Sequence, residues 1–297
     1  MKLSQAAVNC WDYRSSAVPQ PRKQFAQHWL RSEKALSKIV SAAELSKGNL
    51  DQTIKGDRVL EIGPGTGILT RQLLPLAEAV VAVEIDRDLC DSLSKKLGAI
   101  ENFLLLQGDF LTLDLDLLLA PFPHFQNPNK VVANIPYNIT GPILEKLLGT
   151  IAKPASHPFD LIVVLVQKEV AQRLYANPGS KTFGALSVRV QYLATCEFIC
   201  DVPAKAFQPP PKVDSVVVRL RPRPIAVPAT NPRQLETLIK LGFSSKRKML
   251  RNNLQNLVER DRLTLLLEQL GINPDVRAED LSVDQWVELS NRLGDVE

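Results

Sequence analysis

The chain has 297 residues, of which 45% are hydrophobic and 23% charged, and its formal net charge is +4. This composition is typical of a globular protein in water, and the length suits one large domain with a smaller one. No apolar run approaches the roughly 20 residues of a membrane span, and residues 1–18 lack the basic start and apolar stretch of a secretory signal. We therefore expect a cytoplasmic protein with no membrane partner, and we leave an organellar location open.

In residues 57–220, short β-rich runs alternate with helical patterns. The runs are apolar throughout, as expected for parallel strands covered by helices on both faces. They comprise residues 58–62, 79–83, 103–106, 130–133 and 161–166. Two later β-rich stretches, 196–202 and 213–220, are close in sequence with no long helix between them, which predicts an antiparallel edge. The segment therefore predicts a doubly wound α/β sheet.

The remainder of the chain is predicted to be helical. Residues 221–232 hold Pro222, Pro224, Pro228 and Pro232 without periodicity, so we interpret them as a linker. Helices are expected at 234–243, 246–258, 262–270 and 283–293, with Gly271 ending the third and Ser282 capping the fourth. The predicted organisation is a sheet domain, residues 1–222, followed by a small all-helical domain, residues 223–297.

Basic residues cluster around the start of the helical domain. Between residues 221 and 251 they are Arg221, Arg223, Arg233, Lys240, Lys246, Arg247, Lys248 and Arg251, opposed only by Glu236. A second basic pair, Arg22 and Lys23, lies near the amino terminus. Such clusters suit a polyanionic partner. The alternative from charge alone is a solvated helix face.

The four cysteines, Cys10, Cys90, Cys196 and Cys200, contain no C-x-x-C pair. In a strand, Cys196 and Cys200 would be two pleat periods apart, about 13 Å, which is too far to share a metal ion. We therefore expect no metal site, and we interpret the cysteines as reduced thiols of a cytosolic protein.

A glycine-rich segment follows the first run of the sheet. It reads Gly63-Pro64-Gly65-Thr66-Gly67 and leads into a helical pattern. Such a strand, turn and helix commonly bind a nucleotide cofactor at the carboxyl edge of a sheet, because glycine lets the backbone approach a ligand. The spacing G-x-G-x-G differs from the G-x-G-x-x-G of dinucleotide binders. The alternatives are a structural turn and an NAD enzyme.

Acidic residues follow the next two runs. Glu84 could accept hydrogen bonds from ribose hydroxyls, and Asp109 could accept one from the amino group of an adenine ring. Together with the glycine segment they make this region resemble class I S-adenosylmethionine methyltransferases.

The fourth run leads into Asn134-Ile135-Pro136-Tyr137. An adenine amine is a poor nucleophile because its lone pair is delocalised into the ring. The Asn134 side-chain oxygen and the Ile135 carbonyl are suited to accept its two N–H groups and aim that lone pair. Pro136 restricts the backbone of Ile135 to extended torsions, and Tyr137 offers a ring face for an extruded base. The tetrapeptide therefore predicts methylation of an adenine-like amine; the bland alternative is an Asn-Pro turn.

With these motifs, the chain resembles the KsgA-type ribosomal RNA adenine dimethyltransferases, relatives of the Erm resistance methyltransferases, from Arg22 to about Leu293. The resemblance is carried by residues 22–30, 61–65, 134–138, 167–170, 206–215 and 246–248. It implies S-adenosylmethionine as cofactor and transfer of two methyls to each of two adjacent adenines near the end of small-subunit ribosomal RNA, on an immature subunit. We expect a monomer.

The resemblance also implies roles for single residues. His28 and Leu30 would contact the methionine end of the cofactor, near Gly63 and Gly65. Glu84 would hold the ribose and Asp109 the adenine amine, while Asn134 would face both the cofactor and the target. Phe207 would pack on the target base opposite Tyr137; the alternative is a core phenylalanine. The predicted RNA contacts are Arg22, Lys23, Arg221, Arg223, Lys246, Arg247, Lys248 and Arg251.

The chain departs from the family pattern at its amino-terminal motif. The family usually reads Phe-Gly-Gln-Asn-Phe-Leu where residues 25–30 read Phe-Ala-Gln-His-Trp-Leu. Ala26 forbids an unusual torsion that glycine would allow, and His28 changes a polar contact. Gln208 replaces a usual threonine, which we expect to be tolerated, and we assign no role to residues 120–129.

Three other functions fit parts of the pattern. An Erm-type enzyme would methylate large-subunit RNA; the run at 212–215 and the long carboxyl-terminal domain favour the small-subunit type. A DNA adenine methyltransferase would be expected to carry a separate recognition domain. A non-catalytic ribosome-assembly or transcription factor on the same fold is disfavoured by the intact Asn134, Tyr137 and glycine segment.

Overall fold

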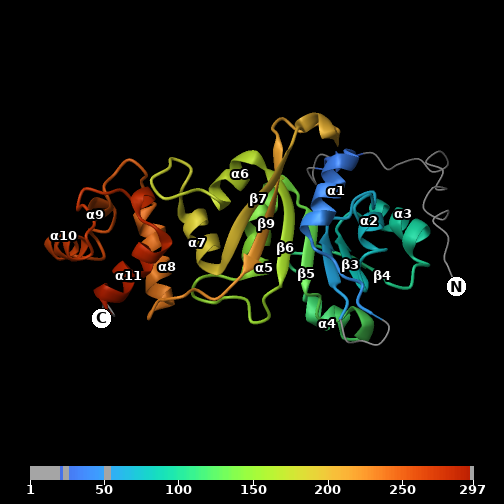
Figure 1. The fold of residues 1–297 in the computed structure, drawn as a ribbon, viewed down its shortest axis with the longest axis horizontal. Helices are drawn as coiled ribbons and strands as arrows, with labels where there is room; N and C mark the ends of the chain where they lie inside the picture. Colours follow the sequence, from blue (N-terminus) through green and yellow to red (C-terminus); the bar gives the residue numbers. More distant parts are fainter. Residues whose placement is uncertain (1–20, 23–26, 50–54, 295–297) are drawn as a thin grey trace.

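The computed structural model describes residues 21–22, 27–49 and 55–294, and its centre is a seven-stranded sheet (Figure 1). The strands, in spatial order, are β4 (Phe103–Gln107), β3 (Ala79–Glu84), β2 (Arg58–Ile62), β5 (Lys130–Asn134), β6 (Leu161–Gln167), β9 (Ser215–Pro222) and β7 (Ala194–Val202). Strands β2 to β6 are mutually parallel, whereas β9 is antiparallel to both β6 and β7. The predicted doubly wound sheet and its antiparallel edge are therefore confirmed.

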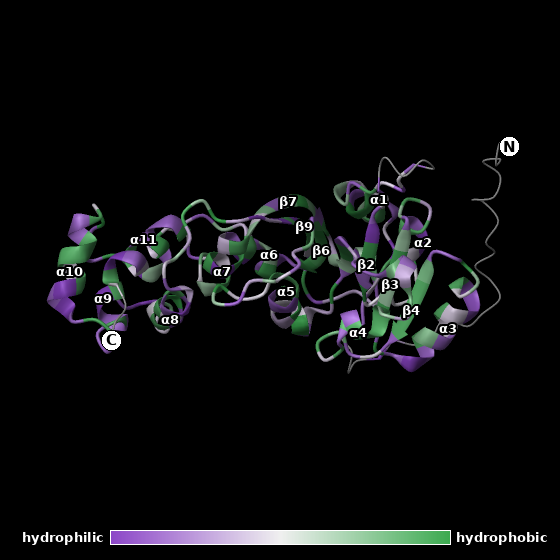
Figure 2. Ribbon diagram, turned by 90° about the horizontal axis from the view of Figure 1, so that it is seen from below, coloured by the Kyte–Doolittle hydropathy of each residue, from purple (hydrophilic) through white to green (hydrophobic). Residues whose placement is uncertain are grey.

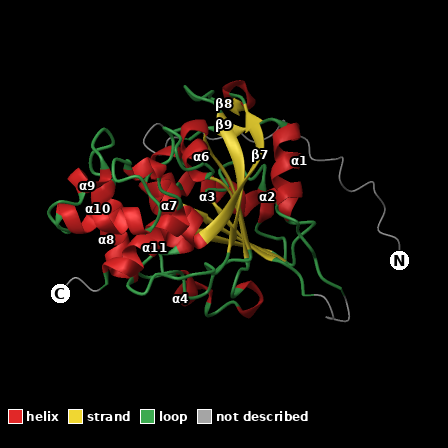
Figure 3. Cartoon of the chain, turned by 60° about the vertical axis from the view of Figure 1, so that its left-hand side comes forward, coloured by secondary structure: helices red, strands yellow, loops and turns green. Residues whose placement is uncertain are grey.

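Helices cover both faces of the sheet, as the continuous apolar strands require. Every residue of β3 is buried, as are the first six of β6. One face packs against α1 (Glu33–Ala42), α2 (Thr70–Leu73) and α3 (Arg87–Leu97). The other packs against α4 (Leu115–Leu119), α5 (Thr140–Leu148), α6 (Lys168–Leu174) and α7 (Ala185–Leu193). Figure 3 shows the helices flanking the strands, and Figure 2 shows mostly hydrophobic colouring on β4, whereas β2 also carries hydrophilic positions.

A second, two-stranded sheet joins distant parts of the chain. Strand β1 (Trp29–Leu30) pairs antiparallel with β8 (Phe207–Gln208), with Trp29 opposite Gln208 and Leu30 opposite Phe207. The backbone N–H of Arg31 extends this pairing by donating to the carbonyl of Ala206 at 2.8 Å. The amino-terminal motif is thereby fixed beside the proline-rich segment that enters β9.

The carboxyl-terminal helices form a bundle at one end of an elongated molecule (Figure 1). They are α8 (Pro232–Gly242), α9 (Leu250–Asn253), α10 (Arg260–Gln269) and α11 (Val283–Leu293). Trp286 of α11 is fully buried at their centre. The same core includes Phe183, Val188 and Tyr192, which precede the predicted boundary at residue 222. The bundle is therefore packed on α7 and continuous with the sheet domain.

The predicted helix over residues 246–258 is wrong. Only Leu250–Asn253 is α-helical, because the Leu250 N–H donates to the Val276 carbonyl at 2.8 Å instead of to a carbonyl one turn earlier. The Asn253 side chain also donates to the carbonyl of Ser245 at 3.0 Å, which holds the preceding segment as a turn. Lys246, Arg247 and Lys248 thus lie in an exposed turn.

The other carboxyl-terminal helices agree with prediction within a few residues. Helix α8 begins two positions early, at Pro232, because proline suits the first position of a helix. Ser282 caps α11 by accepting a hydrogen bond from the Gln285 N–H at 3.2 Å. None of the helices in the described part of the chain has the length and apolar composition needed to cross a membrane.

Candidate active site

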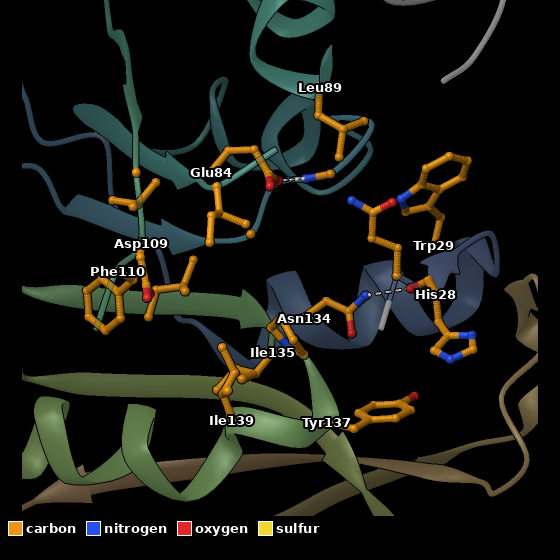
Figure 4. A pocket seen from close by; sticks show the side chains of 18 residues that line it. His28, Trp29, Glu84, Leu89, Asp109, Phe110, Asn134, Ile135, Tyr137 and Ile139 are labelled. Carbon is orange, nitrogen blue, oxygen red and sulfur yellow. Dashed lines mark hydrogen bonds between the residues drawn. The ribbon is translucent and has the colours of Figure 1, made fainter. Parts of the chain in front are cut away.

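The carboxyl ends of β2, β3, β4 and β5 open into one pocket, which is closed on one side by residues 27–29 (Figure 4). The structure brings together nine of the predicted site residues in its lining: His28, Gly63, Gly65, Glu84, Asp109, Asn134, Ile135, Pro136 and Tyr137. The pocket also has apolar walls, to which Ile85, Leu89 and Phe110 contribute. Two predicted residues, Leu30 and Phe207, are not in the lining.

The glycine segment has the backbone that its sequence predicts. Gly63, Gly65 and Gly67 have φ angles of 69°, 59° and 79°, which side chains rarely adopt. A Cβ atom on Gly67 would also lie 2.7 Å from the Leu93 Cδ2 atom, so this glycine is needed for packing. At Gly63 the nearest atom to such a Cβ is 3.9 Å away. The backbone near Gly63 is therefore accessible to a ligand.

Glu84 ties the end of β3 to the glycine segment. Its carboxylate accepts hydrogen bonds from the Gly65 N–H at 3.1 Å and from the Asp86 N–H at 3.0 Å. The side chain is buried, and this burial raises the pKa of its carboxyl group. Glu84 therefore presents a fixed, largely dehydrated acceptor at the pocket wall, suited to hydroxyl donors.

Asp109 lies at the opposite wall, two residues after β4. One of its carboxylate oxygens accepts a hydrogen bond from the Leu111 N–H at 2.9 Å. Within the part of the chain that the structure describes, the other oxygen has no hydrogen-bond partner. A second acceptor is thus available beside Phe110, next to the apolar walls where a purine would fit.

Asn134 is oriented by the amino-terminal motif. Its amide nitrogen donates to the His28 carbonyl at 3.2 Å, and Figure 4 shows the amide oxygen turned away from that carbonyl. The Ile135 side chain is buried, and its N–H donates to the Leu165 carbonyl at 3.3 Å. Among the described residues, no N–H group donates to the Ile135 carbonyl. The two acceptors predicted from the sequence are therefore both available.

Tyr137 is fixed by Ser215, the first residue of β9. The two hydroxyl oxygens are 2.6 Å apart, and burial raises the pKa of the Tyr137 phenol. The His28 ring lies nearly parallel to the Tyr137 ring, with centroids 5.7 Å apart and planes inclined by 19°. Its Nδ1 donates to the Pro209 carbonyl at 2.8 Å.

Phe207 is placed differently from its predicted role as the second ring against the target base. It is 3% exposed and packs with Leu30 in the core between the sheet and α1. The pairing of β1 with β8 is the physical reason, because it sets Leu30 directly opposite Phe207. In this arrangement the ring that faces Tyr137 belongs to His28. Leu30 is buried as well.

The predicted RNA contacts fall into two groups. Arg22, Arg221 and Arg251 are paired with acids: Arg22 with Asp86 and Asp88, Arg221 with Glu44 and Glu197, and Arg251 with Asp275. The other predicted contacts in the described ranges are exposed and have no acidic partner there; they are Arg223, Lys246, Arg247 and Lys248. Lys23 and Ala26 lie outside the described residues. The exposed group is the better candidate for phosphate contacts.

The structure draws attention to three residues, in or around the site, that the sequence did not single out. Trp29 lines the pocket, Ser215 fixes Tyr137, and Glu61 lies buried in β2 directly before the glycine segment. All three belong to the motifs that carry the family resemblance, which is the signal that could have drawn attention to them. The described residues contain no group of three or more His, Cys, Asp or Glu side chains that could hold a metal ion.

The sheet is doubly wound and carries a glycine loop after β2, acids at the carboxyl ends of β3 and β4, and Asn-Ile-Pro-Tyr at the carboxyl end of β5. Together these features define a class I methyltransferase. The chain belongs to the ribosomal RNA adenine dimethylase family, whose model matches residues 18–295. Among solved structures, a dimethyladenosine transferase from Plasmodium falciparum is similar, with a TM-score of 0.71 and 28% identity over 88% of this chain and 96% of that one. The 23S rRNA methyltransferase ErmE gives a TM-score of 0.68 and 29% identity over 89% of this chain and 99% of that one.

Close relatives bear a more specific name. A protein of Nostoc punctiforme called ribosomal RNA small subunit methyltransferase A is 74% identical over 273 residues, which is 92% of this chain and 95% of the relative. A protein of the same name from Rippkaea orientalis is 62% identical over 276 residues, which is 93% of this chain and 98% of the relative. The resemblance predicted from the motifs is therefore confirmed at the level of the family.

Proposed function

We propose that this chain dimethylates the exocyclic amine, N6, of two adjacent adenines near the 3′ end of small-subunit ribosomal RNA, with S-adenosylmethionine as methyl donor. The observation that carries the proposal is the pair of available acceptors at Asn134 and Ile135, in the same pocket as the acids Glu84 and Asp109. The name of the 74% identical relative supports the choice of subunit.

The residues of the pocket fit this cofactor. Glu84 is a fixed acceptor for ribose hydroxyls, and the unpartnered oxygen of Asp109 suits the amino group of adenine. Ile85 and Phe110 offer apolar surface for the ring system. The open backbone at Gly63 leaves room for the methionine portion. The cofactor supplies a methyl group that is already activated by its bond to a sulfonium.

In the proposed reaction, the residues of this chain act by positioning the target amine against the methyl group. With one N–H of the target amine bound by the Asn134 oxygen and the other by the Ile135 carbonyl, the nitrogen lone pair is directed toward the methyl group. The alkylated amine is acidic, so its proton can leave to water without a strong general base. Tyr137, held by Ser215, gives the base a ring to stack on. The base can enter between Tyr137 and His28 only after these rings move apart.

The proposed substrate is RNA in an immature small subunit. Arg223, Lys246, Arg247 and Lys248 are exposed cations that can contact phosphates near the helical bundle. A target adenine would be splayed out of its stack to reach the pocket, as single-stranded segments of RNA allow. We infer that the enzyme acts as a monomer in the cytoplasm, where such subunits are assembled.

The Erm-type alternative has a similar fold but weaker sequence support. ErmE is 29% identical to this chain, whereas the relatives named for the small subunit are up to 74% identical. The pocket itself does not separate the two substrates, because both reactions methylate the same amine. The choice between them therefore depends on the RNA and not on the chemistry of the site.

Nucleoside mass spectrometry tests the proposal. Small subunits from cells that lack the modification are incubated with the protein and S-adenosylmethionine, and large subunits serve as the matched control. We expect N6,N6-dimethyladenosine in small-subunit RNA only. Its appearance in large-subunit RNA alone would establish the Erm-type alternative, and its absence from both would overturn the proposal.

The variant Asn134→Ala provides the internal control. It removes one of the two acceptors, so methyl transfer should fall by more than about tenfold, equivalent to about 1.4 kcal/mol of activation free energy. RNA affinity should stay within about twofold, because Asn134 lies in the pocket and not among the exposed cations. Transfer within tenfold of the unaltered enzyme would refute the role of Asn134.

A further inference from the structure

Trp29, a residue of the pocket lining, carries an unpaired hydrogen-bond donor. Its indole Nε1 is buried and has no hydrogen-bond partner among the described residues. The residue lines the pocket, and Figure 4 shows the indole nitrogen on the side of the ring that is turned toward Glu84. A buried N–H without an acceptor is destabilising, so such groups are uncommon in folded proteins. A ligand that supplies an acceptor would remove this cost.

The indole is also positioned against the glycine segment. Its Cδ1 and Nε1 atoms lie 3.3 and 3.5 Å from the place that a Cβ atom on Gly65 would occupy. Any side chain at residue 65 would press on this ring, so the close approach depends on glycine. The N–H of Gly65 is itself held by the Glu84 carboxylate. Trp29 therefore lies beside the loop and the acid that the proposed function assigns to the cofactor.

A second indole in the chain provides a comparison. Trp286 also has a buried Nε1 without a partner, but it is fully enclosed in the helical bundle. It lines neither the pocket nor any surface near it. Among the described residues, an unpaired indole N–H is thus found at Trp29 and at Trp286, and of these two it is Trp29 that lines a pocket.

We propose that the Trp29 indole N–H donates a hydrogen bond to an oxygen of bound S-adenosylmethionine. This inference rests on the proposed function, and it adds a cofactor-binding residue to those predicted from the sequence. Two oxygens have the required chemistry: a carboxylate oxygen of the methionine portion and a ribose hydroxyl. Donation to the charged carboxylate would be the stronger of the two.

Calorimetric binding of S-adenosylhomocysteine tests the inference without any methyl transfer. The variant Trp29→Phe keeps an aromatic ring at this position and removes the N–H together with part of the indole ring. A carboxylate acceptor predicts an affinity loss of about tenfold or more, and a hydroxyl acceptor predicts a loss of about threefold. Trp286→Phe is the matched control and should bind as the unaltered protein does. Circular dichroism establishes that each variant is folded.

Binding of 5′-methylthioadenosine, which lacks the amino-acid portion, identifies the acceptor. If only S-adenosylhomocysteine is weakened, the acceptor is the carboxylate; if both ligands are weakened equally, it is a ribose hydroxyl. Unchanged affinity for both ligands in folded Trp29→Phe would overturn the inference while leaving the proposed function intact. If the unaltered protein bound neither ligand, the proposed function itself would fail.

Discussion

Glu61 carries a carboxyl group that is buried inside β2, two positions before Gly63 of the glycine segment. It is 1% exposed, and among the described residues its Oε2 atom has no hydrogen-bond partner. Burial raises its pKa from 4.5 to about 8, and the nearby charge of Glu84 acts in the same direction. Near neutral pH the group is therefore mostly protonated, which avoids an unpaired charge in the interior.

This pKa predicts how stability depends on pH. The folded protein holds a proton on Glu61 up to about pH 8, whereas an unfolded chain loses it near 4.5. The protonated Glu61 side chain therefore favours the folded state fully below pH 4.5. This contribution is lost progressively as pH rises from 4.5 through about 8. We expect the free energy of unfolding to fall between about pH 5 and 8.5. The decrease should be larger than in the Glu61→Gln variant by on the order of a few kcal/mol.

Urea unfolding at several pH values measures this difference. Glutamine has a similar shape and cannot ionise. All other titrating groups are the same in the two proteins, so their contributions cancel in the difference between the two stability curves. Parallel curves of stability against pH for the two proteins would show that Glu61 does not titrate in this range.

At the residue scale, the sequence predicts side chains that act directly after a strand. Glu84 and Asn134 are the last residues of β3 and β5, and Asp109 lies two residues after β4. The carboxyl ends of parallel strands meet at one edge of the sheet. Phe207 and Trp29 could not be placed in this way. Their positions depend on the pairing of two-residue strands that are distant in sequence and carry no periodic signal.

At the scale of elements, Gly242 sets how closely α8 packs on α11. A Cβ atom at this position would lie 2.5 Å from the Cη2 atom of Trp286 and 3.1 Å from the Leu250 Cδ1 atom. The fully buried Trp286 ring cannot move away without displacing the bundle core. Packing against Trp286 therefore leaves no room for a side chain at Gly242, the last residue of α8.

Substitution at this contact should destabilise the protein. Gly242→Ala is expected to lower the free energy of unfolding by about 1–3 kcal/mol, which is typical of an overpacked core. Gly141→Ala is the matched control, since Gly141 also lies in a helix but nothing is within 4 Å of its added Cβ. That variant should be neutral or more stable by up to about 1 kcal/mol. Equal stability of the two variants in urea would contradict the packing argument.

The elements also show where local patterns fail. Ser282 was predicted as the cap of α11 because cap positions have strong residue preferences. Pro232, predicted as the end of the linker, is instead the first residue of α8. The segment containing Lys246 was wrongly predicted as helix, since its apolar spacing is compatible with one. The competing hydrogen bond from Leu250 to Val276 is a tertiary contact that no local pattern encodes.

At the scale of the whole molecule, the exposed cations lie near the helical bundle, away from α3 at the other end of the sheet (Figure 1). If they contact phosphates, replacing Lys246, Arg247 and Lys248 with glutamine should weaken RNA binding. The slope of log affinity against log salt should also become shallower by about two, because fewer counterions are released.

A charge-matched variant provides the comparison. Replacing Arg87, Lys95 and Lys96 of α3 removes the same number of cations from the opposite end of the sheet. We expect its salt dependence to resemble that of the unaltered protein. Equal slopes for both triple variants would mean that only the net charge matters and that the turn makes no specific contact.

The ribbon formed by β1 and β8 has a thermodynamic consequence for the two ligands of the enzyme. Through it the His28 carbonyl holds the Asn134 amide, and the Pro209 carbonyl holds the His28 ring that faces Tyr137. The wall of the cofactor site and the entrance for the target base are thus one connected piece of backbone. We expect the ligand that arrives first to order that piece for the second. Linkage then requires that each raise the affinity of the other by the same factor, so that this short ribbon makes binding cooperative.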